Sequence, residues 1–232
     1  MNVAEKAYSL GIRKATIGFS TGKDSVVGLD MMIKAGIEPV PIYFYIVPEL
    51  EFIENNIKLY ENHFGVKVGR MPHPILYDYI RNIDWQPYGK VFTMYMLDIG
   101  SRITFEMGNK EYLSKKKIEG VEYDCNCMKM SDSLNRRLLL RKLPDIDTKK
   151  KIIYLAKYMT DKDIFEYMKQ NNIPLTDDYK IFGRSWDGLS YHFLYGVHKH
   201  YPRDYETIKS YFPLIDAELF RYKLVNKYRN EE

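Results

Sequence analysis

Apolar and amphipathic segments alternate over the first third of the chain. Short apolar runs predict strands at residues 14–19, 39–47 and 66–72, and the second run is apolar enough to be buried on both faces. Between them, apolar side chains at helical spacing predict helices at residues 24–36 and 49–65. Strands that alternate with helices in this way predict an α/β fold with a doubly wound, mostly parallel sheet.

The pattern is less regular in the rest of the chain. It predicts a fourth strand at 117–124, a strand or connector at 150–159, and helices at 91–108, 131–144, 160–174 and 202–212. Ser131 or Asp132 is the expected N-cap of the helix that stops before Pro144. In the helix that follows, Thr160 and Asp163 have the spacing of a capping box.

Apart from its one predicted helix, the tail is expected to be rich in loops. We therefore divide the chain into an α/β domain, residues 1–174, and a helical and loop-rich C-terminal extension, residues 175–232, packed on it.

Composition narrows the class of protein. The 232 residues are 45% hydrophobic and 28% charged, which is typical of a globular protein, and the net charge of +4 suits anionic ligands but is too weak to argue for nucleic acid. No run of about 18 apolar residues is present, so we expect no membrane span. Two cysteines and no N-terminal apolar segment lead us to expect a reducing, cytoplasmic location.

Residues 18–27, "GFSTGKDSVV", form the most informative loop, because they join the first predicted strand to the first predicted helix. Free backbone N–H groups and the positive end of the helix dipole favour an anion there. Gly22 allows close approach of the backbone, Lys23 adds a positive charge, and Ser20, Thr21 and Ser25 add hydroxyl donors. A polyphosphate is the ligand that these groups favour. Asp24 fits such a site as a helix cap or as a ligand of a metal ion that accompanies the phosphate.

Two common phosphate motifs do not match this loop. A Walker A loop needs G-x-x-x-x-G-K-[ST], and Gly18 and Gly22 have the wrong spacing for it. The loop is not G-x-G-x-x-G either. A plain polar turn between a strand and a helix is the alternative interpretation.

The segment "FSTGKDSVVGLDMM", residues 19–32, resembles the pyrophosphate loop S-G-G-K-D-S of the adenine nucleotide α-hydrolase (PP-loop ATP pyrophosphatase) superfamily, and within it the phosphoadenosine phosphosulfate (PAPS) reductase-like family. Thr21 replaces the second glycine, at some cost in backbone freedom. "CMKMSDSLNRRLLL", residues 127–140, and "MTDKDIFEYMKQNN", residues 159–172, resemble later family segments, with Met159 where tryptophan is usual. The resemblance covers most of residues 14–213.

The resemblance implies ATP or PAPS as the nucleotide, with Mg²⁺. Lys23 is the first candidate to stabilise a leaving pyrophosphate, and Arg136 and Arg137 are second, although a solvated helix face explains the two arginines equally well. Asp24 and Asp132 are candidate metal ligands, with helix capping as the alternative for Asp132. The expected nucleotide-binding residues are Phe19, Ser20, Thr21, Gly22, Lys23, Asp24, Ser25, Tyr43, Tyr45, Ile46 and Ser133.

The cysteines bear on which reaction the family resemblance implies. Sulfonucleotide reductases of the family need a nucleophilic cysteine near the C-terminus, and no cysteine follows Cys127. Cys125 and Cys127 are too few for a four-ligand metal site, and two small loop residues are the simplest interpretation, with a sulfur carrier as the alternative.

Three functions follow from the sequence. The first is ATP-dependent adenylyl transfer with release of pyrophosphate. The second is PAPS reduction, or sulfur transfer to a nucleotide or nucleic acid, through Cys125 or Cys127. The third is a non-catalytic nucleotide-binding module that acts with a partner protein. The sequence leaves open whether the chain forms a homodimer, and nothing in it supports nucleic acid as a partner.

Overall fold

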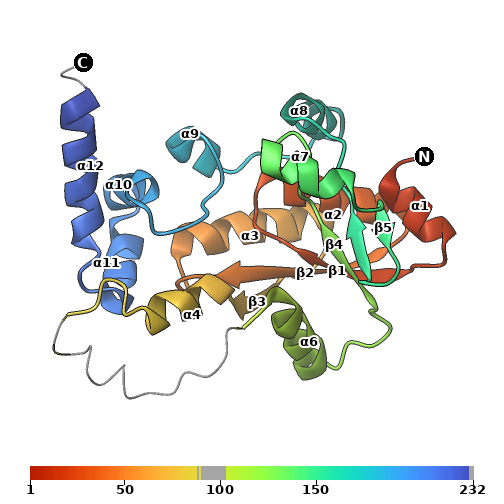
Figure 1. Cartoon of the computed structure of the whole chain (residues 1–232), viewed down its shortest axis with the longest axis horizontal. Helices are drawn as coiled ribbons and strands as arrows, with labels where there is room; N and C mark the ends of the chain where they lie inside the picture. The colour runs from red at the N-terminus through yellow and green to blue at the C-terminus, as the bar shows by residue number, and fades with distance from the viewer. Residues whose placement is uncertain (88, 90–102, 230–232) are drawn as a thin grey trace.

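A six-stranded sheet forms the centre of the computed structural model, which describes residues 1–87, 89 and 103–229 (Figure 1). The strand order is β3-β2-β1-β4-β6-β5. The strands are β1 (Lys14–Gly18), β2 (Glu38–Tyr45), β3 (Gly69–Pro72), β4 (Tyr123–Asn126), β5 (Ile146–Asp147) and β6 (Ile152–Tyr154). All pairings are parallel except that of the edge strand β5 with β6. The predicted α/β class with a mostly parallel sheet is confirmed.

The strand order reverses at β1. The chain proceeds from β1 to β2 and β3 on one side, whereas β4 pairs with the other edge of β1. In parallel sheets, such a reversal opens a crevice at the carboxyl ends of the two strands, and ligands bind there. The loop after Gly18 leaves β1 at this position.

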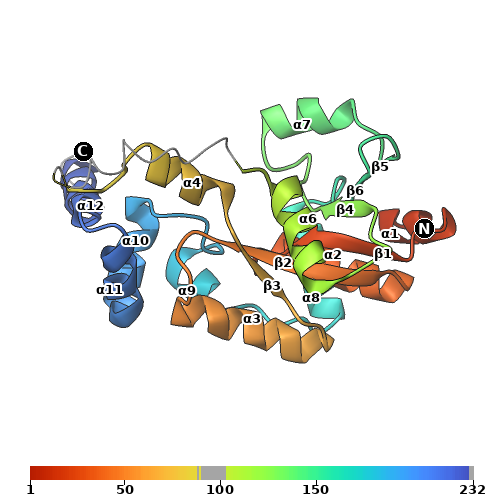
Figure 2. The same cartoon turned by 90° about the horizontal axis from the view of Figure 1, so that it is seen from below.

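Helices cover both faces of the sheet. Helices α2 (Lys23–Ala35) and α3 (Glu51–Phe64) lie on one face and α6 (Phe105–Lys116) lies on the other, as Figure 2 shows from below. Helices α1 (Val3–Ser9) and α8 (Asp161–Gln170) both contact α2. The face with α2 is thus covered by several helices, and in the described part of the chain α6 lies on the opposite face.

Two predicted helices begin at different residues from those expected. Helix α7 (Leu134–Arg141) is capped by Ser133, whose Oγ accepts a hydrogen bond from the backbone N–H of Arg136 at 3.1 Å. The prediction of Ser131 or Asp132 as the cap is wrong, because Ser131 donates its hydroxyl to another segment. Helix α6 begins after Thr104 and runs to Lys116, and residues 91–102 of the helix predicted at 91–108 lie outside the described residues.

The fourth strand begins later than predicted. Residues 117–122 are not part of it, because α6 extends to Lys116 and the chain turns through left-handed conformations at Lys117 and Gly120 before β4 starts. The segment 150–159 contains a strand, β6, of only three residues. The capping box of Thr160 and Asp163 at the start of α8 is confirmed.

The C-terminal part is helical with connecting loops, and it contains more helices than the one predicted at 202–212. It contains α9 (Asp178–Phe182), α10 (Tyr191–His200), α11 (Pro202–Tyr211) and α12 (Asp216–Arg229). Helix α4 (Pro74–Arg81) and α1 were not predicted either. These helices are short, and their apolar faces are completed by contacts with distant segments, which periodicity does not reveal.

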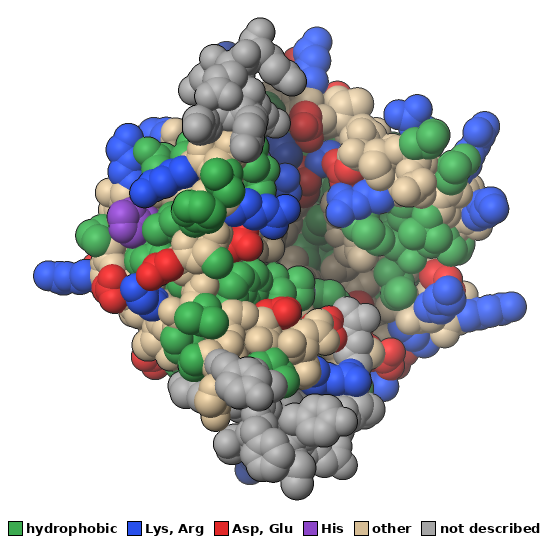
Figure 3. Space-filling view, turned by 60° about the vertical axis from the view of Figure 1, so that its left-hand side comes forward, with side chains coloured by type: hydrophobic (Ala, Val, Ile, Leu, Met, Phe, Trp, Pro, Cys, Tyr) green, Lys and Arg blue, Asp and Glu red, His purple; other side chains and the backbone are tan. Residues whose placement is uncertain are grey.

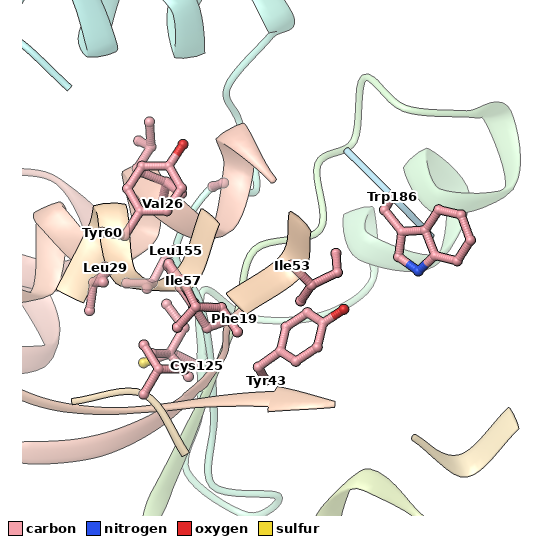
Figure 4. Close-up of a cluster of buried hydrophobic side chains, with 14 of the residues drawn as sticks. Phe19, Val26, Leu29, Tyr43, Ile53, Ile57, Tyr60, Cys125, Leu155 and Trp186 are labelled. Atoms are coloured by element: carbon pink, nitrogen blue, oxygen red, sulfur yellow. The ribbon is translucent and has the colours of Figure 1, made fainter. Parts of the chain in front are cut away.

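Buried hydrogen bonds tie the C-terminal helices to the sheet domain. The Asp204 carboxylate on α11 accepts the backbone N–H groups of Glu51 and Phe52 at 2.7 and 3.0 Å, and so caps α3. One hydrophobic core runs through both parts: Trp186 belongs to the same cluster as Phe19 and Tyr43, which Figure 4 draws in close-up. The division of the chain at residue 174 stays a prediction.

No helix in the described part of the chain is long and apolar enough to cross a membrane.

Candidate functional site

The loop between β1 and α2 is held by its own hydroxyl groups. Ser25 Oγ donates to the carbonyl oxygen of Gly22 at 2.9 Å and accepts the backbone N–H of Ser20 at 3.2 Å. Gly22 is the N-cap residue of α2 and makes no side-chain cap, so the first N–H groups of the helix are left to other partners. Tyr179 accepts the backbone N–H of Lys23 at 2.8 Å and thereby ties the C-terminal part to the loop.

Thr21 has a strained backbone in this loop. Its φ of +58° lies in the left-handed region, where a β-branched side chain is rare. The side chain is fully buried, and its hydroxyl oxygen finds no hydrogen-bond partner among the described residues. This geometry gives a physical reason why glycine would be favoured at the position.

Gly22 is needed for a close contact. A Cβ atom at Gly22 would lie 2.8 Å from Ser185 Oγ and 3.1 Å from Ser20 Oγ. The segment around residue 185 therefore packs directly on the loop. This contact between distant parts of the chain could not be predicted from the loop sequence.

Lys129 is the main residue that the sequence analysis missed. Its side chain is 1% exposed, and its ammonium lies 2.5 Å from Asp24, 2.9 Å from Asp132 and 3.2 Å from Asp161. Burial opposes the charged form, but the hydrogen bonds to the carboxylates raise the pKa of Lys129 well above its ordinary value. Lys129 therefore stays charged and joins the loop to the segment before α7. In the sequence, Lys129 follows Cys127 by two residues and belongs to no motif that predicts this role.

Lys23 and Arg136 complete a cluster of charges around Lys129. Lys23 Nζ lies 3.2 Å from Asp161 and 3.6 Å from Asp24, and an Arg136 guanidinium nitrogen lies 2.5 Å from Asp132. Burial raises the pKa of Asp132, but hydrogen bonds from Lys129 and Arg136 outweigh it and lower the pKa below its ordinary value. Three cations thus face three carboxylates. We call these six residues the loop cluster: Lys23, Asp24, Lys129, Asp132, Arg136 and Asp161.

Two cavities adjoin the loop. The larger, of about 850 Å³, follows the open face of the sheet, and the smaller, of about 760 Å³, lies between the loop and the residues around Tyr179 and Arg184. Both volumes are in the range typical of small-molecule sites. Figure 3 shows one face of the molecule hollowed near its centre, with hydrophobic, acidic and basic side chains around the hollow.

Most of the predicted site residues border these cavities. Phe19, Ser20, Asp24, Ser25, Tyr43, Ile46, Asp132 and Arg136 line the larger one, and Ser20, Gly22, Lys23, Asp24, Asp132, Ser133 and Arg136 line the smaller one. Thr21, Tyr45 and Arg137 line neither. Arg137 is exposed on α7, where its Nε donates only to the carbonyl oxygen of Met130, at 3.4 Å.

The two cysteines are poor nucleophiles in this setting. Cys125 is buried beside Phe19 and Ile57 (Figure 4), and burial raises the pKa of its thiol well above the ordinary range. Burial, and then the nearby Asp24 carboxylate, raise the pKa of Cys127 to about 12. A Cβ atom added to Gly28 would lie 2.4 Å from Cys127 Sγ, so this sulfur points toward α2. Both thiols are therefore protonated at neutral pH, although Cys125 and the half-buried Cys127 also border the larger cavity.

The acidic residues do not form a metal cage by themselves. No group of three or more metal-ligating side chains suited to an ion exists among the described residues. Lys129 already neutralises Asp24 and Asp132. Asp24 Oδ1, however, is buried and has no hydrogen-bond partner in the described part. The arrangement does not suit a resident metal ion, but this oxygen could contact one that arrives bound to a phosphate.

Comparisons with known proteins show a likeness of fold. No protein-family model matches the chain, and no curated protein sequence matches it significantly. One similar solved structure is the NH3-dependent NAD synthetase from Campylobacter jejuni in complex with the nitrate ion, with 11% identity, coverage of 98% of this chain and 91% of that chain, and a TM-score of 0.45. Another is the U34-tRNA thiolase NcsA from Methanococcus maripaludis with its [4Fe-4S] cluster, with 13% identity, coverage of 92% and 77%, and a TM-score of 0.44. No residue assignment rests on either.

Proposed function

We propose that the chain is an ATP-using enzyme of the adenine nucleotide α-hydrolase superfamily, within the PAPS reductase-like family, that transfers an adenylyl group to an acceptor and releases pyrophosphate. One observation carries the proposal. The loop between β1 and α2 leaves the sheet at the strand-order reversal, leads into a helix N-terminus that has no side-chain cap from its N-cap residue, and is surrounded by the cations of the loop cluster. This is the combination that a nucleotide polyphosphate requires.

The charge balance of the loop cluster favours ATP that carries Mg²⁺. Its three cations are matched by three carboxylates, so the cluster has no excess positive charge for a bare polyanion. A Mg²⁺ ion bound to the nucleotide supplies that charge. Asp24 Oδ1, which has no hydrogen-bond partner in the described part but lies 3.6 Å from Lys23 Nζ, is the candidate oxygen to contact it. We expect Mg²⁺ to enter with the substrate.

In the proposed reaction, a nucleophilic oxygen or nitrogen of the acceptor attacks the α-phosphorus of ATP. The bond from that phosphorus to the bridging oxygen breaks, and the electron pair leaves with pyrophosphate. Lys23 and Arg136 stabilise the negative charge that grows on the leaving group. Lys129 positions Asp24 and Asp132 and keeps them ionised. Tyr43 and Ile46, which line the larger cavity, are the candidates to contact the adenine.

Calorimetric titration tests nucleotide binding. We expect MgATP to bind more tightly than MgPAPS, and metal-free ATP to bind more weakly than MgATP. Lys23→Ala removes one charged contact and should weaken MgATP binding by about 10- to 100-fold. Lys162→Ala is the matched control, because Lys162 is 83% exposed and its ion-pair partner among the described residues is Glu166. Equal affinity in wild type and Lys23→Ala would contradict the site.

An assay of turnover distinguishes an adenylyl-transferring enzyme from a non-catalytic nucleotide-binding module. The protein is incubated with α-labelled MgATP and a fractionated small-molecule extract, and pyrophosphate and the labelled adenylyl group are followed. Release of pyrophosphate that depends on one fraction supports adenylyl transfer. Binding of MgATP without pyrophosphate release from any fraction would make the chain a nucleotide-binding module.

The sulfur-transfer and reductase alternatives need a reactive thiol. The raised pKa values of Cys125 and Cys127, which keep both thiols protonated at neutral pH, argue against them. A variant with both cysteines replaced by serine should keep the pyrophosphate-releasing activity. Loss of activity in a folded double variant, together with a preference for PAPS, would favour sulfur chemistry instead.

A further inference from the structure

The larger cavity extends well beyond the loop. It is bordered by every position from Val121 to Met128 except Tyr123, along β4 and its flanks, and by α6 on the other side. The four residues of β4, from Tyr123 to Asn126, span about 13 Å on their own. A nucleotide held by the loop, with its adenine at the ends of β1 and β2, leaves the part of the cavity along β4 without a ligand. We call this part the β4 groove.

We propose that the β4 groove is the acceptor site, and that it binds a small organic anion that also carries a hydrogen-bond donor. The role of the groove as an acceptor site rests on the proposed function. The binding of an anion in the groove does not depend on it. Three features of the groove carry the assignment: a free buried acceptor atom, an aromatic wall and unpaired lysines at one end.

Asn109 supplies the free acceptor atom. Its side-chain amide lies on α6, borders the groove, and donates through Nδ2 to Asp124 Oδ1 at 3.0 Å. Because the carboxylate of Asp124 accepts, the amide must present its nitrogen there and its oxygen elsewhere. Asn109 is only 9% exposed, and its Oδ1 finds no hydrogen-bond partner among the described residues. A ligand N–H or O–H would satisfy this oxygen, which is costly to leave unpaired.

An aromatic wall lies beside Asn109. The rings of Phe44 and Phe105 meet edge to face at 4.9 Å, and His73 meets Phe105 at 5.0 Å. All three border the cavity. His73 Nδ1 accepts the backbone N–H of Ile75, and burial lowers the pKa of the imidazole, so the neutral ring carries its proton on Nε2. This wall suits a planar, apolar part of a ligand.

Unpaired lysines lie at the end of the groove away from the loop. Lys149 and Lys150 are exposed, border the cavity, and have no carboxylate within ion-pair distance in the described part of the chain. Their neighbours are already neutralised, since Lys151 pairs with Glu122 at 3.0 Å and Lys110 pairs with Glu106 at 2.7 Å. The Asp147 carboxylate accepts the backbone N–H groups of Lys149 and Lys150 at 3.0 and 2.9 Å and offsets part of their charge. The net positive charge that remains at this end favours an anionic group.

Two fluorescent probes test the groove. 8-Anilinonaphthalene-1-sulfonate has an aromatic body, an N–H donor and an anionic sulfonate, and N-phenyl-1-naphthylamine is nearly the same molecule without the sulfonate. We expect Lys149→Ala/Lys150→Ala to weaken binding of the sulfonate probe by about fivefold to tenfold at low salt, because two exposed charge contacts are lost. Binding of the neutral probe should stay the same.

A matched variant controls for overall charge. Lys162→Ala/Lys169→Ala removes two exposed lysines of α8, which do not border the cavity, and should leave both probes unaffected. If the sulfonate probe binds equally to wild type and to the Lys149→Ala/Lys150→Ala variant, the anion site is refuted. Equal losses in the two double variants would also refute it, because the effect would be one of net charge.

Competition with MgATP separates the acceptor site from the nucleotide site. If MgATP and the sulfonate probe bind together, the β4 groove is a second site, as proposed. If MgATP displaces the probe competitively, the groove belongs to the nucleotide and the acceptor assignment is wrong. If MgATP does not bind at all while the lysine-dependent probe binding persists, the proposed function fails and the anion site stands.

Discussion

The loop cluster and the far end of the β4 groove hold their charges in different ways. At the loop cluster, which we also call the loop end, each of Lys23, Lys129 and Arg136 is paired with at least one carboxylate, and Lys129 is buried. At the far end of the β4 groove, Lys149 and Lys150 are exposed, and their ammonium groups form no ion pair among the described residues, although Asp147 accepts their backbone N–H groups. The loop end is therefore ordered before any ligand arrives, whereas the far end has charge available for one.

This difference bears on what each end recognises. A paired cluster holds its side chains in fixed positions, which favours a ligand of defined shape that brings its own cation. Exposed lysines recognise negative charge with little geometric demand, and salt screens them. An adenylyl-transferring enzyme needs both features: ordered side chains that position the nucleotide, and a second site that accepts an anionic acceptor with little demand on its shape.

The largest expected effect comes from removing the buried cation. Lys129→Met leaves Asp24 and Asp132 without their shared partner, and breaking a buried ion pair costs about 3 kcal/mol of folding stability or more. Urea denaturation measures the change. Lys149→Met, at the exposed end, should change the free energy of unfolding by less than about 0.5 kcal/mol. Similar changes in the two variants would show that the ends do not differ as described.

The sheet could be predicted from the sequence because the hydrophobic pattern of each strand lies within one short segment of the chain. A run such as residues 39–47 is apolar on both faces, and it alternates with amphipathic helices at a spacing that few other folds share. The loop from Phe19 to Ser25 could be predicted for the same reason, because the strand, the loop and the helix are adjacent in the chain. Its structure places most of the predicted residues at one of the two cavities.

The missed residues depend on contacts between distant segments. Lys129 lies 105 residues from Asp24 in the sequence, and nothing in "CMKMSD" indicates which carboxylates surround it. Tyr179 and Ser185 reach the loop only because the C-terminal part packs on it. The β4 groove combines α6, β4 and the residues before β6. Such surfaces arise from tertiary packing and leave no periodic pattern in the sequence.

Lowering the pH should change the free energy of unfolding by a smaller amount. The folded-state pKa values of Asp132 and Asp161 are below their ordinary values, because hydrogen bonds from Lys129 and other cations outweigh burial. A carboxyl group with a depressed pKa contributes stability above its unfolded pKa of about 3.9 and loses that contribution as the pH falls through the folded value. Wild type should therefore lose stability below about pH 4 to 5, measured by urea denaturation across pH.

The acid effect should depend on the loop cluster. In Lys129→Met the main partner of these carboxylates is gone, so the decline in the free energy of unfolding toward low pH should be shallower than in wild type. In Lys149→Met the decline should match wild type, because Lys149 pairs with no acidic residue in the described part. A steeper decline in Lys129→Met would contradict the assigned pairing.

The smallest expected effect is a gain in stability at the loop. Thr21→Gly removes the strain of a β-branched residue in the left-handed region, and it removes a buried hydroxyl that has no partner in the described part. These two gains in stability exceed the entropic cost of a more flexible glycine in the unfolded chain. We expect the free energy of unfolding to rise by about 1 kcal/mol. Glu49→Gly is the matched control, because Glu49 has a φ of +61° but an exposed side chain.

The difference between the two glycine variants isolates the contribution of the buried hydroxyl. If Thr21→Gly gains more than Glu49→Gly and still binds MgATP, the threonine hydroxyl is a cost that nucleotide binding does not offset. If Thr21→Gly is more stable but binds MgATP more weakly than wild type, the unpaired hydroxyl donates to the nucleotide, and the strain at Thr21 is part of the binding site. A loss of stability in Thr21→Gly would show that the loop does not hold Thr21 in the left-handed conformation.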